Sequence, residues 1–257
     1  MKLSIIKIGG NIIEDETSLH AFLKLFSNLE GKKILVHGGG KRATHIATKL
    51  GIESKMVNGR RITDADTLEV ITMVYGGLVN KNMVAKLQAF GTDAIGLTGA
   101  DINSIQSNKR PVAAIDYGFV GDVKKVANKS IEKLLQAGFT PVFCAITHNG
   151  KGQLLNTNAD TIASQVAVGM SEIHETSIYY CFELNGVLED FNDKNSVVKI
   201  INPSVYKELL ANGVIADGMI PKLDNCFDAL NNGVHKVYIG NTSMLTKEND
   251  NYTTITL

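Results

Sequence analysis

The sequence has no tryptophan, only four prolines and only three cysteines in 257 residues. It also lacks net charge, because 26 lysines and arginines balance 26 aspartates and glutamates. Proteins that bind nucleic acids or membrane surfaces broadly need an extended basic face, and this balance argues against one. Any anion-binding site in this chain must therefore be local.

Long hydrophobic runs are missing as well. No stretch of the sequence approaches the roughly 18 uninterrupted apolar residues of a membrane-spanning helix. The short apolar run at the N-terminus is interrupted by Lys7 and by glycines, which a signal peptide would not show. These absences predict a cytoplasmic protein.

The cysteines are too few for a disulfide framework and have the wrong spacing for a zinc site. Cys144, Cys181 and Cys226 form no C-x-x-C pair, and their number is odd. We expect three buried, reduced thiols.

The order of apolar patterns predicts an α/β fold. A chain of this length, 44% hydrophobic and 20% charged, has enough apolar residues for one large domain or two lobes with a substantial core. Short, apolar, β-branched segments predict strands at 3–8, 33–37, 94–97, 140–146, 177–182, 235–239 and 252–256. Apolar residues at helical spacing predict helices at 19–26, 43–50, 64–90, 129–137, 158–168, 204–212 and 221–230. This alternation predicts a mostly parallel sheet with helices on both faces.

Two features interrupt the regular alternation. A proline and two glycines predict a hairpin across residues 111–123. A boundary near residues 170–177 divides the chain into two lobes of one continuous sheet, residues 1–175 and 176–257.

Two predicted strands run directly into consecutive glycines. A glycine pair at residues 9–10 follows the first strand, and a triplet at residues 38–40 follows the second. Glycines let backbone N–H groups approach an oxyanion closely, and Lys7 adds a cation just before the first pair. Tight strand-to-helix packing would explain either group alone. Together they indicate a site for phosphate or carboxylate.

The glycine groups fit neither of the common nucleotide patterns. The sequence has no G-x-x-x-x-G-K-S/T and its triplet is not G-x-G-x-x-G, which disfavours a P-loop protein and a Rossmann dehydrogenase. His37 and the triplet resemble the oxyanion strip of some esterases, but the G-x-S-x-G nucleophile elbow is missing. We therefore interpret His37 as structural.

Three later segments carry side chains suited to an anionic substrate. Asn156 offers an amide that donates and accepts, and Asp160 falls in the first turn of a predicted helix, although helix capping would explain both. Lys222 lies at the start of a predicted helix, beside the positive end of the helix dipole. A cation is unfavourable there unless an anion lies nearby. Arg60 and Arg61 are either exposed surface residues or residues that bind a carboxylate through two parallel hydrogen bonds.

These segments together resemble the amino acid kinase family. Matching strips follow one another through essentially the whole chain, at residues 6–10, 36–40, 58–63, 118–122, 155–160 and 218–222. Six strips in the correct order are far more specific than any one of them. The similarity is greatest to the members that phosphorylate N-acetyl-L-glutamate.

The resemblance implies an open three-layer αβα sandwich and a defined reaction. ATP would phosphorylate the γ-carboxylate of N-acetyl-L-glutamate to N-acetyl-L-glutamyl 5-phosphate, the second step of arginine biosynthesis. The lobe of residues 1–175 would bind the acyl amino acid and form a homodimer, and the lobe of residues 176–257 would bind ATP. Mg²⁺ would arrive on the phosphates of ATP, without a dedicated metal site. Relatives inhibited by arginine have an extra N-terminal helix before the first strand, so we expect an arginine-insensitive enzyme.

The resemblance also implies roles for individual residues. Lys7 and Lys222 match two lysines that stabilise the transition state, and Asp160 matches the acid that orients both. The residues matching the substrate contacts are Gly39, Gly40, Arg61 and Asn156. The residues matching the nucleotide contacts are Gly9, Gly10, Glu183, Leu184, Asn185, Gly186, Val187, Leu188, Asp217, Gly218 and Met219.

One strip departs from the family pattern, and three alternatives stay open. Glu183 stands where the family usually has aspartate, so a catalytically inactive ligand-binding or regulatory protein of the same fold is one alternative. A second is N-succinylglutamate as substrate, with Arg60 holding its additional carboxylate. A third is another family kinase, acting on glutamate as glutamate 5-kinase does, or on carbamate, aspartate or a nucleoside monophosphate.

Overall fold

An eight-stranded sheet forms the centre of the computed structural model, which describes residues 1–57, 59–215, 219–246 and 249–257. The strand order is β12-β14-β13-β11-β1-β2-β8-β5. The strands are β1 (Lys2–Ile8), β2 (Lys32–His37), β5 (Ala94–Leu97), β8 (Thr140–Cys144), β11 (Glu175–Cys181), β12 (Ile200–Ile201), β13 (Lys236–Gly240) and β14 (Thr253–Ile255). Neighbouring strands run parallel except β13 and β14, so the predicted mostly parallel sheet is confirmed.

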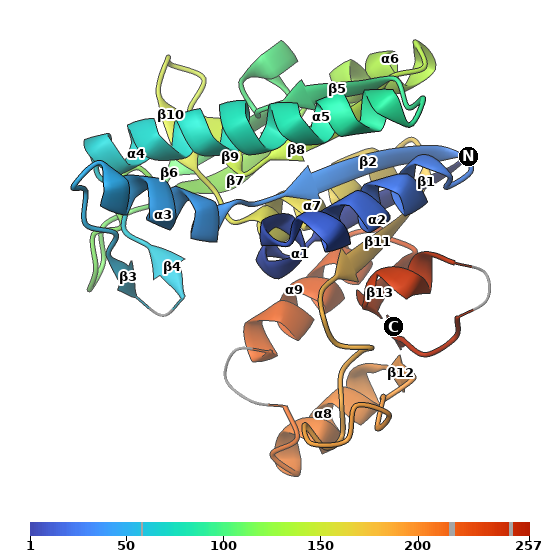
Figure 1. Ribbon diagram of the computed structural model, residues 1–257. Helices are drawn as coiled ribbons and strands as arrows, with labels where there is room; N and C mark the ends of the chain where they lie inside the picture. Colours follow the sequence, from blue (N-terminus) through green and yellow to red (C-terminus); the bar gives the residue numbers. More distant parts are fainter. Residues whose placement is uncertain (58, 216–218, 247–248) are drawn as a thin grey trace.

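Helices cover both faces of this sheet (Figure 1). They are α1 (Gly10–Glu14), α2 (Glu16–Ser27), α3 (Gly40–Lys49), α4 (Ala65–Ile71), α5 (Asn80–Ala89), α6 (Asn128–Gln136), α7 (Ala159–Ser171), α8 (Pro203–Ala211) and α9 (Ile220–Asn231). Helices α2 and α5 pack together on one face, and α7 packs on β11, β1 and β2 from the other. The αβα sandwich is therefore confirmed. Within the described ranges, no helix has both the length and the apolar character needed to cross a membrane.

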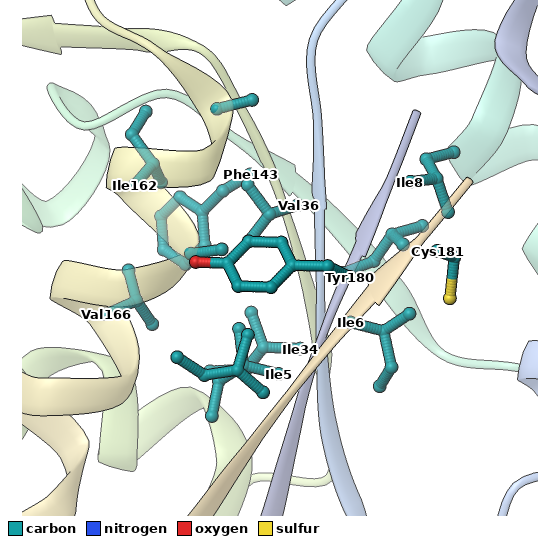
Figure 2. Packing of buried hydrophobic residues seen from close by; sticks show 14 of the residues in the cluster. Ile5, Ile6, Ile8, Ile34, Val36, Phe143, Ile162, Val166, Tyr180 and Cys181 are labelled. Carbon is teal, nitrogen blue, oxygen red and sulfur yellow. The ribbon is translucent and has the colours of Figure 1, made fainter. Parts of the chain in front are cut away.

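The core lies where the sheet meets these helices. Ile5 and Ile6 of β1 are both fully buried, because successive side chains of a strand covered on both faces point into opposite layers. Tyr180 of β11 extends toward Ile162 and Val166 of α7 (Figure 2). The core is therefore continuous from β1 to β11, the two strands whose ends carry the candidate site.

The three cysteines lie in this core. All are free and buried, as the sequence predicts. Burial raises the pKa of the Cys144 thiol to about 12, so it stays protonated and unreactive at neutral pH.

A smaller sheet of order β10-β9-β6-β7 corrects two sequence predictions. Its strands are β6 (Ile105–Lys109), β7 (Gly121–Val126), β9 (Ile146–His148) and β10 (Leu154–Asn156). The predicted strand over 140–146 was wrong at its end, because Ile146 begins β9 of the second sheet. The predicted hairpin over 111–123 was also wrong, because its paired strands are β6 and β7 and most of that range is their connection. Proline and glycine marked the connection, not the strands.

The helix predicted over residues 64–90 is three consecutive helical segments. A π-helix, η1 (Thr72–Val79), lies between α4 and α5. A π-helix has one more residue in each hydrogen-bonded turn and is frequently found at functional sites. Apolar spacing continues through it, so the sequence pattern does not distinguish it from an α-helix.

A buried ion-pair cluster at the amino-terminal edge of the central sheet predicts acid-sensitive stability. Glu132 accepts a hydrogen bond from Lys32 Nζ at 2.8 Å, and His174 Nε2 lies 2.5 Å from its other oxygen. Burial alone would raise the pKa of Glu132, but hydrogen bonds and charge from His174 and Lys32 outweigh burial and lower it. A carboxyl group whose pKa is lower in the folded state than in the unfolded state stabilises the fold. This contribution is complete above the pKa of the unfolded state and is lost as the pH falls through the pKa of the folded state.

We expect Glu132→Gln to lower the free energy of unfolding at pH 7 by about 1–3 kcal/mol, because the buried His174 and the partly exposed Lys32 lose a charged acceptor. The difference in free energy of unfolding between the variant and the unsubstituted protein should shrink below about pH 4, because Glu132 of the unsubstituted protein becomes protonated there and loses its stabilising charge. Urea denaturation at both pH values measures it. Glu208→Gln on the exposed face of α8 is the control. An equal deficit at both pH values would contradict the linkage.

Candidate functional site

A cavity of about 260 Å³ opens at the carboxyl ends of β1 and β2. The carboxyl ends of parallel strands are where open α/β sheets bind ligands. The cavity is bordered by the glycines after both strands, by the β3–β4 hairpin (Met56–Val57 and Arg60–Arg61) and by the start of α7. Figure 1 shows β3 and β4 projecting beside α3.

Three charged residues meet at one end of this cavity, where Lys7 and Asp160 line the wall and Lys222 contacts Asp160 without lining the cavity itself. Lys7 Nζ lies 2.7 Å from Asp160 Oδ1, and Lys222 Nζ lies 3.7 Å from Asp160 Oδ2. Lys7 belongs to β1, Asp160 to the first turn of α7 and Lys222 to the first turn of α9. The structure thus brings together the three residues that the sequence singled out, although they are far apart in the chain.

The cluster keeps a net positive charge. Burial on its own would raise the pKa of Asp160, but the charges of Lys7 and Lys222 outweigh it, so the pKa lies below its ordinary value. The carboxylate is therefore ionised at neutral pH. Lys222 also lies over the ring of Phe182, with Nζ 5.0 Å from the centroid. Two cations and one anion leave one uncompensated positive charge beside the cavity.

The main chain of Asp160 is held by two side chains. Asn158 caps α7, and its Oδ1 accepts hydrogen bonds from the N–H groups of Asp160 at 2.7 Å and Thr161 at 3.2 Å. The hydroxyl of Tyr180 donates to the Asp160 carbonyl at 3.2 Å. The capping role that the sequence left open for this segment therefore belongs to Asn158, and it positions Asp160.

The glycine triplet forms another part of the cavity wall. Gly39 has a φ of +150°, and a Cβ there would lie 2.9 Å from Cδ1 of Tyr75. Its carbonyl accepts the first hydrogen bond of α3, from Ala43. Gly40 and Gly10 also line the cavity, whereas Gly9 is not among its lining residues. The Gly9 N–H already donates to the Cys181 carbonyl at 2.8 Å.

Arg61 is buried, and the interpretation of it as an exposed surface residue was wrong. One of its guanidinium nitrogens, Nη2, donates to the Gly40 carbonyl at 3.0 Å and to Thr44 Oγ1 at 2.7 Å. Asn156, at the end of β10, donates from Nδ2 to Thr63 Oγ1 at 3.0 Å. Both side chains line the cavity.

Comparison with known proteins identifies the family. The family model described as the amino acid kinase family matches residues 2–241. The chain belongs to the amino acid kinase family.

Relatives of this amino acid kinase are similar over nearly their full length. A protein from Phocaeicola vulgatus named acetylglutamate kinase is 58% identical over 238 residues, which is 93% of either chain. One of the same name from Cytophaga hutchinsonii is 59% identical over 239 residues, covering 93% of this chain and 90% of that protein. The solved carbamate kinase of Giardia lamblia bound to AMP-PNP has a TM-score of 0.72 at 12% identity, covering 99% of this chain and 98% of that one. That last likeness shows the fold alone.

The segment of this amino acid kinase expected to contact nucleotide lies in the other half of the sheet. Residues 183–188 begin one residue after the end of β11 and are not among the residues that line the cavity. Asn185 Nδ2 donates to the Lys194 carbonyl at 3.1 Å, and the Val187 N–H donates to Thr253 Oγ1 at 2.8 Å. Met219 is the residue before α9. The predicted contacts Asp217 and Gly218 lie outside the described residues.

The cavity of this amino acid kinase is also lined by residues whose role the sequence pattern does not predict. Arg110 donates from Nε to both carboxylate oxygens of Asp122, at 3.1 and 3.2 Å, and both residues line the wall. Tyr75, from the π-helix, lies under Gly39. Asp122 ended one of the matching strips, but nothing in the sequence pairs it with Arg110.

No group of three or more histidine, cysteine, aspartate or glutamate side chains in the described part of the chain could hold a metal ion.

Proposed function

We propose that this amino acid kinase transfers the γ-phosphoryl group of ATP to the γ-carboxylate of N-acetyl-L-glutamate. The product is N-acetyl-L-glutamyl 5-phosphate, the second intermediate of arginine biosynthesis. The observation that carries the proposal is the Lys7–Asp160–Lys222 cluster at the end of a glycine-walled cavity. The names of the relatives that are 58% and 59% identical support this choice of substrate.

The chemistry requires alignment and charge neutralisation more than proton transfer. A carboxylate is already a nucleophile, so it needs no general base. Its approach to the γ-phosphoryl group brings several negative charges together. Lys7, from β1, and Lys222, from α9, would neutralise the charge that spreads over the transferred group, and Asp160 would hold the two ammonium groups in place.

The cavity wall would bind the acyl amino acid. Arg61 retains donors besides Nη2 that can grip the α-carboxylate. Asn156 would hold the substrate main chain. The N–H groups of Gly39 and Gly40 would face the reacting carboxylate.

The nucleotide would lie along the carboxyl ends of β1 and β11. Gly10 would approach the phosphates, and we keep Gly9 as a close backbone contact, although its N–H is bonded to Cys181. Residues 183–188 and 217–219 would border the rest of the nucleotide. Mg²⁺ would come to the site on the phosphates of ATP, as part of the substrate.

We further propose that the enzyme is a cytoplasmic homodimer with lobes at residues 1–175 and 176–257. Size-exclusion chromatography with light scattering should give twice the mass of one chain. A monomer would contradict the proposed assembly.

An ADP-release assay with Mg-ATP tests the function. N-acetyl-L-glutamate, N-succinyl-L-glutamate, free L-glutamate and carbamate are offered separately, and we expect the highest kcat/KM with the acetyl compound. A higher value with N-succinyl-L-glutamate would move the proposal to that substrate. ATP binding without turnover of any of the four would favour a non-catalytic ligand-binding protein.

Arg61→Lys should separate substrate binding from catalysis. Lysine keeps the charge but loses the planar two-bond fork, so KM for N-acetyl-L-glutamate should rise about 10-fold or more. The kcat and the KM for ATP should stay within about threefold. The lost contact stabilises the bound substrate and the transition state equally, so its loss raises KM for the acyl amino acid and leaves kcat unchanged. Arg42→Lys on the exposed face of α3 is the matched control. An unchanged KM for the acyl amino acid would remove Arg61 from the proposed site.

A further inference from the structure

His37 is a buried side chain that the proposed reaction does not use, yet it adjoins the glycine triplet. It ends β2 and is fully buried. Its Nδ1 lies 2.7 Å from the Gly38 carbonyl, and its Nε2 lies 3.0 Å from Nδ2 of Asn80. Both ring nitrogens therefore have a partner, one on the cavity wall and one in the core.

The two partners determine where the ring carries its proton. A carbonyl oxygen only accepts, so the nitrogen facing Gly38 must be the donor, Nδ1–H. The Asn80 amide nitrogen only donates, so Nε2 must accept from it. The same Asn80 nitrogen donates to the Val142 carbonyl at 2.9 Å. Burial lowers the pKa of His37 to about 4, which agrees with a neutral ring at neutral pH.

The rest of the network holds Asn80 in this orientation. Lys81 Nζ lies 3.2 Å from Asn80 Oδ1 and donates to the Gly96 carbonyl at 3.0 Å. Asn80 therefore presents its nitrogen, not its oxygen, to His37. A side chain at Gly96 would displace it, since a Cβ there would lie 1.9 Å from Asn80 Oδ1.

The direction of the Gly38 carbonyl fixes the direction of the Gly39 N–H. In a trans peptide the C=O and the following N–H point in opposite directions. Because His37 draws the Gly38 carbonyl toward the core, the Gly39 N–H of the same peptide points away from the core, toward the cavity that Gly38 and Gly39 line. The next peptide is fixed separately, since the Gly39 carbonyl accepts from Ala43 in α3 and leaves the Gly40 N–H at the open helix end.

We propose that His37 is a positioning residue, whose Nδ1–H holds the Gly38 carbonyl so that the Gly39 N–H is aimed at the reacting carboxylate and phosphoryl oxygens. The inference rests on the proposed phosphoryl transfer. It assigns the alignment of one N–H donor to a side chain that does not itself touch the substrate. The functional unit is therefore the chain of bonds from Asn80 through His37 to the Gly38–Gly39 peptide.

Two substitutions separate the two bonds of His37. The amide of His37→Asn lies near the position of Nδ1 and can still donate to Gly38. The longer amide of His37→Gln reaches the position of Nε2 and can accept from Asn80, but leaves the Gly38 carbonyl without its donor. Each variant loses one buried hydrogen bond, so similar decreases in Tm are expected. We expect kcat to fall at least about 10-fold in His37→Gln and to stay within about fivefold in His37→Asn, with KM for ATP unchanged in both.

The outcomes distinguish this inference from the proposed function. Activity of the unsubstituted protein with N-acetyl-L-glutamate is the reference, and its absence would count against the proposed function. If that protein is active, equal loss of kcat in the two variants, or a His37→Gln variant as active as His37→Asn, would overturn the positioning role. A second measurement needs no variant. Nitrogen-15 NMR of the His37 ring should show the Nδ1–H tautomer, and an Nε2–H tautomer would overturn the inference.

Discussion

Replacing Lys7 or Lys222 with alanine is expected to lower kcat about 100-fold or more with N-acetyl-L-glutamate and ATP. Each ammonium group lies beside the same carboxylate, at 2.7 and 3.7 Å, and one comes from strand β1 and the other from helix α9. The transition state has more charge spread over the transferred oxygens than the ground state, so losing one cation costs a few kcal/mol there. Steady-state kcat at saturating concentrations of both substrates measures the effect.

Lys32→Ala is the matched control for these two variants. Lys32 is also a partly exposed lysine paired with a buried carboxylate, at 2.8 Å from Glu132, but it lies at the opposite edge of the sheet. It should lose stability and keep kcat within about twofold. If kcat of Lys7→Ala and Lys222→Ala also stayed at the level of this control, neither lysine would take part in the reaction.

Asp160→Asn is expected to reduce kcat by about 100-fold as well, for a different reason. The amide has the same shape but no charge, so it no longer attracts the two ammonium groups, which then repel each other. The hydrogen bonds of the Asp160 main chain to Asn158 and Tyr180 remain, so the start of α7 should keep its position. The kcat of the variant and its circular dichroism spectrum together test whether charge or shape matters.

Asp66→Asn is the control for the loss of an acid in the first turn of a helix. Asp66 occupies the first turn of α4, as Asp160 occupies that of α7, but it lies apart from the cavity. It should lose only the small helix-dipole contribution of about 0.3–1 kcal/mol to stability. An Asp160→Asn enzyme with kcat close to that of Asp66→Asn would show that the charge of Asp160 is dispensable.

Much of the fold follows from local sequence pattern. Short β-branched runs alternating with 3.6-periodic segments predicted every strand of the central sheet except β12 and every described α-helix except α1, because burial on both faces leaves a clear apolar signature. The π-helix that presents Tyr75 did not follow, since it keeps the apolar spacing of an α-helix. Nor did the division of residues 140–148 between two sheets, because strand partners far along the chain decide it.

For the site, too, some features could be predicted from local sequence and others depend on contacts between distant segments. The glycine turns, Lys7 and Lys222 carried a signal in the sequence, because each is an unusual residue type at a strand or helix end. Asp160 is an ordinary residue for the first turn of a helix, and the family resemblance singled it out. The use of the Gly9 N–H by Cys181, the burial of Arg61 and the Arg110–Asp122 pair depend on segments that meet only in the folded protein. Sequence spacing within a single segment has no information about such partners.

Trapping the reaction product with hydroxylamine tests the central claim most directly, because an acyl phosphate reacts with hydroxylamine to give a hydroxamate. Incubating the enzyme with Mg-ATP, N-acetyl-L-glutamate and hydroxylamine should form the γ-hydroxamate in a one-to-one ratio with ADP. Release of ADP with inorganic phosphate and no hydroxamate would contradict phosphoryl transfer to the carboxylate.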